Sequence, residues 1–388
     1  PFHNYLKDLG AVFGEVAGYE RANWFSNLNQ KPEYQYSWGK QNWFENQKKE
    51  HTAVRQNIGI FDMSSFGKIR VDGEGALNFL QEICTAQINI QIGRIVYTQM
   101  LNEKGGIESD LTISRLGEKS FLLVVPCATL QRDLSYLNRK NNSNEVMIID
   151  ISSSEGVLSI MGPNSRKLLE CVSPNNFSNS VHPFGTWKNI EIGSGLARAH
   201  RVSYVGELGW EIYISSDQCA HVFEEIWKFQ QEMKFNLCGI HALDSCRIEK
   251  AYRHFGHDIT DEDHIVDAGL SFTADLSKKN FEGKESILTK RKIGSSKKML
   301  QFKLNDPSKM IYHNEPVLRD NKIVGYLTSG NFGHTLGGCI GLGYVDSKNL
   351  SNEEILSFDY SIDVAGEIVT AEASLKPMYD PKSERVRM

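Results

Sequence analysis

The sequence IRVDGEGALNFLQEI, residues 69–83, decides the fold. Its first three residues are apolar, polar and apolar in turn, which is typical of a strand with one buried face. Residues 72–75 contain two glycines and predict a turn. Apolar residues then recur at the spacing of one helix face, at Ala76, Phe79, Leu80 and Ile83. The stretch therefore predicts a strand, a tight turn and an amphipathic helix.

A second unit of the same kind follows 89 residues later. Residues 157–160 (VLSI) read as its strand and 162–165 (GPNS) as its turn, and the apolar face of its helix is formed by Leu168, Leu169 and Val172. Between the two units Gly73 aligns with Gly162, and Phe79 aligns with Leu168. We therefore expect two related α/β subdomains.

The rest of the chain completes a predicted α+β architecture. Further strands are expected at 107–115, 121–125, 199–204 and 210–214, and a long helix near 218–233. Residues 278–298 are rich in Lys, Gly and Ser, and from Met299 short strands alternate with turns. These patterns predict an α/β region over 1–285, divided into its subdomains near 67–150, a linker over 286–298 and a small β-barrel or sandwich over 299–388. The aromatic residues of the N-terminal stretch are expected to pack against the first region: Trp24, Phe25, Trp38, Trp43 and Phe44.

Composition excludes several classes of protein. The 388 residues carry a net charge of −5, which gives no argument for a nucleic-acid or anionic-membrane partner. No apolar run is long enough to span a membrane, and the N-terminus has no signal-peptide pattern. The seven cysteines are an odd number without a C-x-x-C pair, which favours a reducing compartment, the cytoplasm, over a disulfide framework. Neither G-x-G-x-x-G nor a P-loop occurs, so no dinucleotide or nucleoside triphosphate site is expected.

Asp110 is the first candidate for chemistry. It lies in the predicted strand after the Gly105–Gly106 turn, and alternation places Asp110, Thr112 and Ser114 on one face and Leu111 and Ile113 on the other. One interpretation is a solvated carboxylate on a strand face. The other is a carboxylate that faces a cavity and accepts a proton from a bound molecule.

Tyr204 and Glu211 are the second candidates, and they bracket SYVGELGWE, residues 203–211. Its two glycines predict a bulge or a close approach of the backbone. A carboxylate accepts two N–H groups side by side, which suits the edge of a planar heterocycle, although a plain hairpin with a surface glutamate fits the same pattern. The histidines between 241 and 264 lack the spacing of a metal site, and no metal is predicted.

Four segments together resemble the glycine-cleavage T-protein family of folate-dependent aminomethyltransferases: FDMSSFGKIRVDGEGA, YTQMLNEKGGIESDLTISRL, SYVGELGWEIYI and ALDSCRIEKAYRHFGHDI. Their order covers about 60–270, and the β-rich tail fits the family's C-terminal domain. The resemblance implies a T-protein-like fold in which the two α/β subdomains form a tetrahydrofolate site and a small β-barrel follows.

The resemblance also implies roles for individual residues. Asp110 matches the family's essential aspartate near the reacting folate nitrogens, and Tyr97 matches a tyrosine that lines the folate site. Tyr204 and Glu211 match the pair that holds the pterin. Three further matches are an apolar pocket residue, a neighbour of the aspartate and an arginine near the folate tail: Phe66, Thr112, and Arg385 or Arg387. The family's A-R-D motif reads Ala-Leu243-Asp here, so one folate-contacting arginine is lost.

The likeness is closer to the folate half of dimethylglycine and sarcosine dehydrogenases and oxidases. It rests on DLGAVFGEVAGYERANWF near the start, on GYLTSGNFGHTLGGCIGLGYV and on the ending PMYDPKSERVR. Because no dinucleotide fingerprint is found, the chain is similar to the transferase part without the flavin half, and a separate flavin dehydrogenase partner is implied.

The implied activity takes a one-carbon unit from an N-methyl amine, as a dimethylglycine- or sarcosine-type iminium, and gives 5,10-methylenetetrahydrofolate. Asp110 would accept or shuttle the proton as the amine leaves. Two alternatives stay open. One is a sulfonium demethylase that gives 5-methyltetrahydrofolate, and the other is a non-catalytic folate-binding protein.

Overall fold

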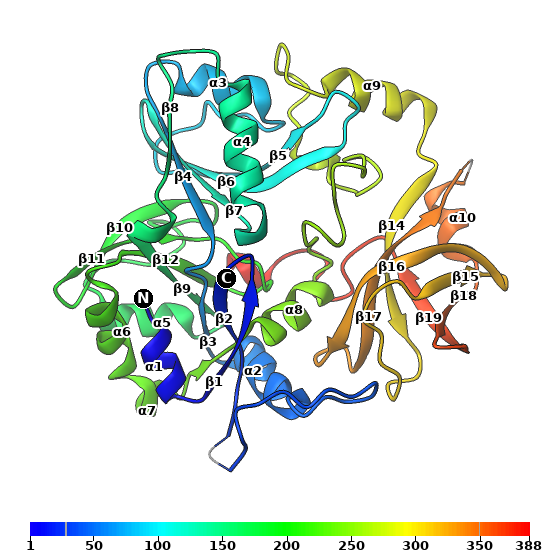
Figure 1. Ribbon diagram of the computed structural model, residues 1–388, viewed down its shortest axis with the longest axis horizontal. Coiled ribbons are helices and arrows are strands. Elements are labelled where there is room, and N and C mark those ends of the chain that lie inside the picture. The colour runs from blue at the N-terminus through cyan, green and yellow to red at the C-terminus, as the bar shows by residue number, and fades with distance from the viewer. Residues whose placement is uncertain (28, 349) are drawn as a thin grey trace.

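The predicted first unit forms as β4 (Gly67–Asp72) and α3 (Ala76–Ile83). The computed structural model describes residues 1–388 except 28 and 349. β4 belongs to a five-stranded sheet, drawn at the top of Figure 1, in the order β5 (Ile95–Leu101), β6 (Ile107–Gly117), β7 (Ser120–Val125), β4 and β8 (Met147–Asp150). One face of this sheet packs against α3 and α4 (Leu130–Lys140) around a continuous apolar core.

The second predicted unit forms as β9 (Glu155–Met161) and α5 (Ser165–Val172). It belongs to a six-stranded sheet in the order β10 (Trp187–Ile192), β11 (Gly195–His200), β12 (Gly209–Ser215), β9, β3 (Gly59–Asp62) and β13 (Asn236–Leu237). Helices α5, α6 (Cys219–Trp227) and α7 (Gln230–Met233) cover one face, and α1 (His3–Asp8) packs beside them.

The aligned glycines of the two units have the same backbone conformation. Gly73 has a φ of 123° and Gly162 a φ of 130°. A Cβ at Gly73 would lie 2.0 Å from the carbonyl oxygen of Glu145, and one at Gly162 would lie 2.3 Å from that of Asn57. Each turn therefore requires glycine, because a side chain would be strained and would collide with backbone. This shared requirement supports the relation between the two subdomains.

The C-terminal region contains a closed six-stranded barrel, drawn at the right of Figure 1, and the expected barrel fold is confirmed. Its strands follow the order β14 (Lys297–Leu304), β17 (Gly338–Asp346), β16 (Lys322–Gly333), β15 (Pro316–Arg319), β18 (Tyr360–Val364) and β19 (Glu367–Ser374), with α10 (Asn352–Ser357) between β17 and β18. After β19 the tail leaves the barrel and returns to the first region, where Arg385 meets Glu207.

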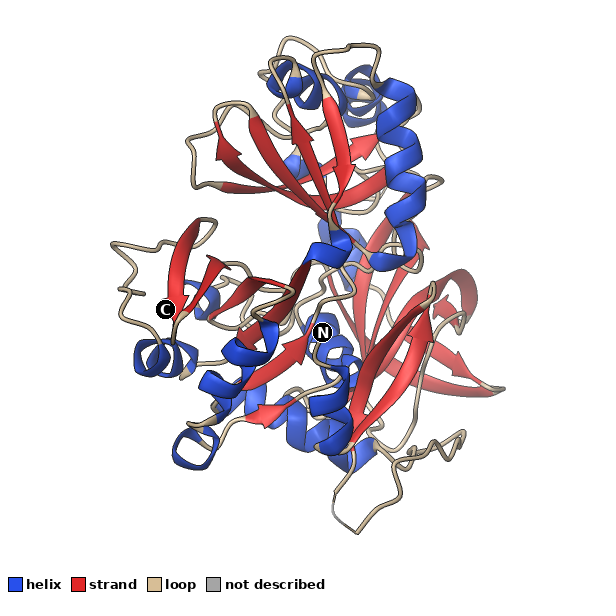
Figure 2. Cartoon of the chain, turned by 60° about the vertical axis from the view of Figure 1, so that its left-hand side comes forward, coloured by secondary structure: helices blue, strands red, loops and turns tan. Residues whose placement is uncertain are grey.

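Helix α8 (Ile240–Glu249) joins the three β units. Ala242, Leu243 and Cys246 pack against both sheets, while Ile248 packs against the barrel. Figure 2 shows the same three units from another side. Helix α2 (Phe44–Gln56) lies along α8, and the hairpin of β1 (Ala11–Val16) and β2 (Tyr19–Phe25) reaches the same helix.

Three expectations need correction: the end of one strand, the continuity of one helix and the burial of one aromatic side chain. The strand expected at 199–204 ends at His200, because the Ser203 hydroxyl accepts the N–H groups of Gly206 and Glu207 and forms a turn in place of a ladder. The helix expected at 218–233 is two helices, since Phe229 N–H bonds only three residues back, to Ile226. Trp38 is 94% exposed, whereas Trp24, Trp43 and Phe44 are buried.

The segment expected as a linker, 286–298, contains most of α9 (Lys284–Ile293) and the first residues of β14. Ile287 of this helix is fully buried in a cluster with Leu101 and Ile107 of the first sheet. The connection between the α/β region and the barrel is therefore packed on the first sheet.

We expect Gly162→Ala to lower the free energy of unfolding by about 2–4 kcal/mol, because the Cβ strains a left-handed turn and collides with the Asn57 carbonyl. Gly117→Ala is the matched control, since its Cβ meets only Ser120, at 3.6 Å. Urea unfolding followed by circular dichroism measures both. Equal stability of the two variants would show that the turn tolerates a side chain.

Candidate functional site

Asp110 lies on β6, in the interior of the five-stranded sheet. Leu111 and Ile113 are buried in the core below α3 and α4, so the opposite face of β6 carries Asp110, Thr112 and Ser114, as alternation predicted. On the neighbouring strand β5, Gln99 pairs with Asp110 and Tyr97 with Thr112. The two adjacent pairs, Asp110 with Gln99 and Thr112 with Tyr97, therefore form one continuous polar patch.

The Asp110 carboxylate is held by a short chain of hydrogen bonds. The Gln99 amide nitrogen donates to its Oδ1 over 2.7 Å, and the Gln99 amide oxygen accepts from the Thr273 hydroxyl. Burial raises the pKa of Asp110 to about 6, although hydrogen bonds from Gln99 and Tyr97 and the charge of Arg253 favour its ionised form. The group is poised to exchange a proton near neutral pH.

Tyr97 and Tyr204 lie on the same side as Asp110. Burial raises the pKa of Tyr97 well above its usual value, and the nearby Asp110 carboxylate raises it further. The Tyr204 hydroxyl donates to the Arg253 carbonyl oxygen over 2.8 Å, and its ring stacks on that of Tyr252 at 6.0 Å. Both tyrosines are neutral and present aromatic surface beside the carboxylate.

Phe66 and Tyr204 belong to the apolar cluster that joins the two sheets. This cluster also contains Leu122 and Val124 of β7, whose register partners on β6 are Ser114 and Thr112. The Asp110 face of the first sheet therefore faces the second sheet. Apolar and aromatic side chains flank the carboxylate, an arrangement that suits a flat heterocycle.

Glu211 lies on β12 of the second sheet and is only 8% exposed. The Tyr213 hydroxyl donates to its Oε2 over 2.9 Å, and burial raises the pKa of Glu211 to about 7. The register partner of Glu211 is His200, whose Nδ1 lies 3.4 Å from the Ser114 hydroxyl on β6. Glu211 therefore faces β6 near Ser114, which lies four residues after Asp110 on that strand.

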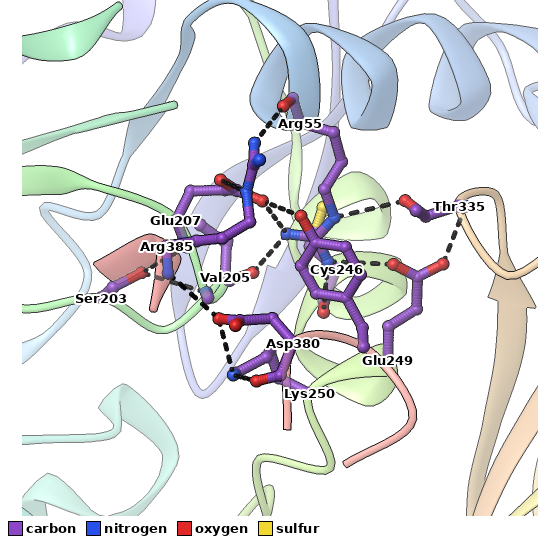
Figure 3. A network of polar contacts seen from close by, with 12 residues as sticks. Arg55, Ser203, Val205, Glu207, Cys246, Glu249, Lys250, Thr335, Asp380 and Arg385 are labelled. Atoms are coloured by element: carbon purple, nitrogen blue, oxygen red, sulfur yellow. Dashed lines mark hydrogen bonds and ion pairs between the residues drawn. The ribbon is translucent and has the colours of Figure 1, made fainter. Parts of the chain in front are cut away.

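Arg385 lies apart from this group, in the network of Figure 3. Its Nε bonds to Glu207 over 2.6 Å, and its Nη2 donates to the Arg55 carbonyl oxygen over 2.7 Å. Arg387 is exposed. The structure thus brings together Asp110, Tyr97, Thr112, Tyr204, Phe66 and Glu211, whereas Arg385 holds the tail to α2 and to the 203–209 turn.

Sequence reasoning missed Arg253, Gln99 and Thr273. Arg253 is the one cation among the groups that shift the pKa of Asp110. Its Nε donates to the Ala268 carbonyl oxygen over 3.1 Å and its Nη1 to that of Ala251. It follows α8 in an irregular segment, so no periodic signal marked it. Gln99 was detectable only through its register with Asp110.

The comparisons with known proteins identify the family and the fold of the chain. The model of the GCVT N-terminal domain matches residues 2–278, and that of the glycine cleavage T-protein C-terminal barrel domain matches residues 297–380. The chain is similar in fold to the glycine cleavage system aminomethyltransferase T from Bartonella henselae, with a TM-score of 0.83, 24% identity and 98% of each chain covered.

Two curated relatives match all of this chain. The 4-methylaminobutanoate oxidase (formaldehyde-forming) of Paenarthrobacter nicotinovorans is 39% identical, and 46% of its length is covered. The mitochondrial sarcosine dehydrogenase of Homo sapiens is 31% identical, and 47% of its length is covered. The chain therefore spans about half the length of these relatives.

The fold and the two family models define a chain of T-protein type, from a family that transfers one-carbon units with folate. The chain belongs to the glycine-cleavage T-protein family, whose members use tetrahydrofolate. Among the residues that the structure describes, no helix is long and apolar enough to cross a membrane.

Asp110→Asn should stabilise the ligand-free chain at pH 7.5. Because its pKa in the folded chain, about 6, exceeds the unfolded value, the carboxylate costs stability as the pH rises through 6. We expect a gain of roughly 1–3 kcal/mol at pH 7.5 and none below pH 4. Guanidinium unfolding across this pH range measures it, and a gain of the same size at every pH would contradict the assignment.

Arg385→Ala should lower the free energy of unfolding by about 2 kcal/mol, because Glu207 is fully buried and loses a charged hydrogen-bond donor. Arg387→Ala is the matched control from the exposed side of the same tail. If Arg385 instead serves only the folate tail, as the resemblance implies, its variant will weaken folate binding and leave the unfolding curve unchanged.

Proposed function

We propose that this chain is an aminomethyltransferase that takes a one-carbon unit from an N-methyl amine, presented as an iminium, and gives 5,10-methylenetetrahydrofolate. The observation that carries the proposal is the Asp110 carboxylate, with its pKa raised to about 6, on a face lined by Tyr97, Tyr204 and Phe66. The folate site is assigned to residues 1–285, ahead of the barrel at 299–388.

The residues present fit tetrahydrofolate. Its pterin is a flat ring with N–H groups along one edge, and Glu211 is a buried acceptor with a fixed orientation, since Tyr213 donates to one of its oxygens. Phe66 and Tyr204 supply apolar and aromatic surface for the ring. Thr112 lies next to Asp110 on the same strand face. When bound, tetrahydrofolate supplies the two amine nitrogens that accept the one-carbon unit.

Asp110 would hold and move the proton in this reaction. Gln99 fixes the carboxylate, so its free oxygen keeps one direction. With a pKa of about 6 the group is mostly ionised at pH 7 and still basic enough to accept a proton from an amine nitrogen. The neutral Tyr97 hydroxyl beside it can relay that proton.

Arg253 supports an N-methylated amino acid as the donor. The two curated relatives are named for 4-methylaminobutanoate and sarcosine, each of which carries an N-methylamine and a carboxylate. Arg253 is the cation near Asp110, and a guanidinium pairs well with a carboxylate. In this proposal Arg253 binds the carboxylate of the amine substrate, while Asp110 exchanges a proton with its nitrogen.

A separate flavin dehydrogenase supplies the iminium in this proposal, and both proteins work in the cytoplasm. An iminium hydrolyses in water, so direct transfer between the two would protect it. Relatives named sarcosine dehydrogenase and dimethylglycine dehydrogenase support an oxidation step ahead of the transfer.

The test supplies tetrahydrofolate with sarcosine, dimethylglycine, 4-methylaminobutanoate or a sulfonium donor, with and without a flavin dehydrogenase, and identifies the folate product by mass. We expect methylenetetrahydrofolate from the amines, only when the dehydrogenase is present. Methyltetrahydrofolate from the sulfonium donor would replace the proposal with a demethylase. Binding of folate without turnover would indicate a non-catalytic folate-binding protein.

Asp110→Asn should reduce turnover at least about 100-fold while it leaves tetrahydrofolate affinity within about threefold. Asp133→Asn is the matched control, because burial also raises the pKa of Asp133 to about 6 but its carboxylate bonds to Thr129 on the helix side of the sheet. Equal turnover in the two variants would refute the role of Asp110.

A further inference from the structure

His200, at the end of β11, has a ring nitrogen that forms no hydrogen bond with any residue that the structure describes. The side chain is 2% exposed, and its Nδ1 lies 3.4 Å from the Ser114 hydroxyl. Its Nε2 is buried and meets no hydrogen-bond partner in the described part of the chain. Buried polar atoms are nearly always bonded, so an unbonded one calls for a specific cause such as a missing ligand or water.

The position of His200 points to a ligand. It is the register partner of Glu211, and its ring lies 4.2 Å from that of Tyr213, which donates to Glu211. Ser114 shares the strand face of Asp110 and lies four residues, or about 13 Å, from it along β6. His200 therefore stands beside the acceptor already assigned to the pterin edge.

The hydrogen bond to Ser114 selects the tautomer of His200. If the Ser114 hydroxyl donates to Nδ1, only the Nε2–H group is left unbonded. In the opposite arrangement both the Ser114 hydroxyl proton and the Nε2 lone pair would lack partners. The first arrangement leaves fewer buried groups unsatisfied, so Nε2 is a donor. Burial, with the charge of Arg198, holds the pKa of His200 well below its usual value, so the ring is neutral.

We propose that the His200 Nε2–H group donates to the carbonyl oxygen at C4 of the pterin, next to the N–H groups that Glu211 accepts. The inference rests on the proposed function and deepens it. Side chains of register partners lie about 5 Å apart, which matches neighbouring groups on one heterocycle edge. His200 and Glu211 together would thus recognise the donor–donor–acceptor edge of a 2-amino-4-oxo ring.

This arrangement predicts discrimination against a 4-amino ring. Such a ring presents an NH₂ group to the His200 donor and lacks the N3 proton that Glu211 accepts. A site built to bond a substrate group rejects the analogue that lacks it, because its own buried groups stay unpaired. The informative quantity is therefore the dissociation constant of the 4-amino analogue divided by that of tetrahydrofolate. A purely structural role of His200 would leave this ratio unchanged.

The experiment is an anaerobic calorimetric titration of the full chain. One titration uses tetrahydrofolate and the other uses its 4-amino analogue. We expect His200→Leu to weaken tetrahydrofolate binding about tenfold, to leave the 4-amino analogue nearly unaffected and so to lower the ratio about tenfold. His200→Gln retains an N–H donor and should keep most of the preference. Ser114→Ala frees the tautomer and should lower the ratio in the same direction, even if His200→Leu does not fold.

His182→Leu is the matched control. His182 is also buried and neutral, but it packs against Trp210, which lies on the opposite face of β12 from Glu211. Its variant should leave the ratio unchanged. An unchanged ratio in both His200→Leu and Ser114→Ala, or an equal loss of both ligands, would overturn the role of His200. Failure of the unaltered chain to bind tetrahydrofolate would instead overturn the proposed function, and this inference with it.

Discussion

The guanidinium of Arg55 is the interaction on which the rest of the structure depends. It is buried in α2 and donates to the carbonyl oxygens of Val205 and Cys246 and to the carboxylates of Glu207 and Glu249 (Figure 3). These bonds connect α2 to the 203–209 turn and to α8. Because Glu207 and Glu249 are both fully buried, loss of the guanidinium would remove a charged partner from each and leave Glu207 with Arg385 and Glu249 with His51.

Each of these two carboxylates extends the connection to another unit. Glu249 accepts the N–H groups of Thr335 and Leu336, which fixes the barrel against α8. Glu207 accepts hydrogen bonds from Arg385 and from the Tyr379 hydroxyl, and these bonds fix the C-terminal tail. The turn that contains Glu207 also separates Tyr204 from Glu211. The site residues of the second sheet are therefore positioned by an ion network that does not itself touch Asp110.

The parts of this structure that were predictable from sequence are those set by local periodicity. The alternation of 107–115 identified the face of Asp110, and the matched turns at Gly73 and Gly162 identified two related units. The strand end at His200 was not predictable, because the Ser203 hydroxyl competes with the ladder for two backbone N–H groups. Arg253 gave no signal because it lies in an irregular segment after α8. His200 gave none because its contact with Ser114 joins two sheets. Asp110, Tyr204 and Glu211 were singled out by chemistry and pattern together, whereas their mutual approach is a property of the tertiary structure.

The site combines groups that burial drives toward neutrality. Burial raises the pKa of Asp110 to about 6 and of Glu211 to about 7, and it holds the pKa of His200 well below its usual value. Such groups can exchange protons near neutral pH. They can also form directed hydrogen bonds with a neutral heterocycle without placing a full charge beside it. A separate set of fixed charges surrounds Arg55, where paired carboxylates and guanidinium groups satisfy one another. The separation has a physical reason: the ion network makes the scaffold rigid, and its rigidity lets the site keep carboxylates that destabilise the fold when they ionise. A site that had to supply its own rigidity through ion pairs would lose the shifted pKa values on which proton transfer near neutral pH depends.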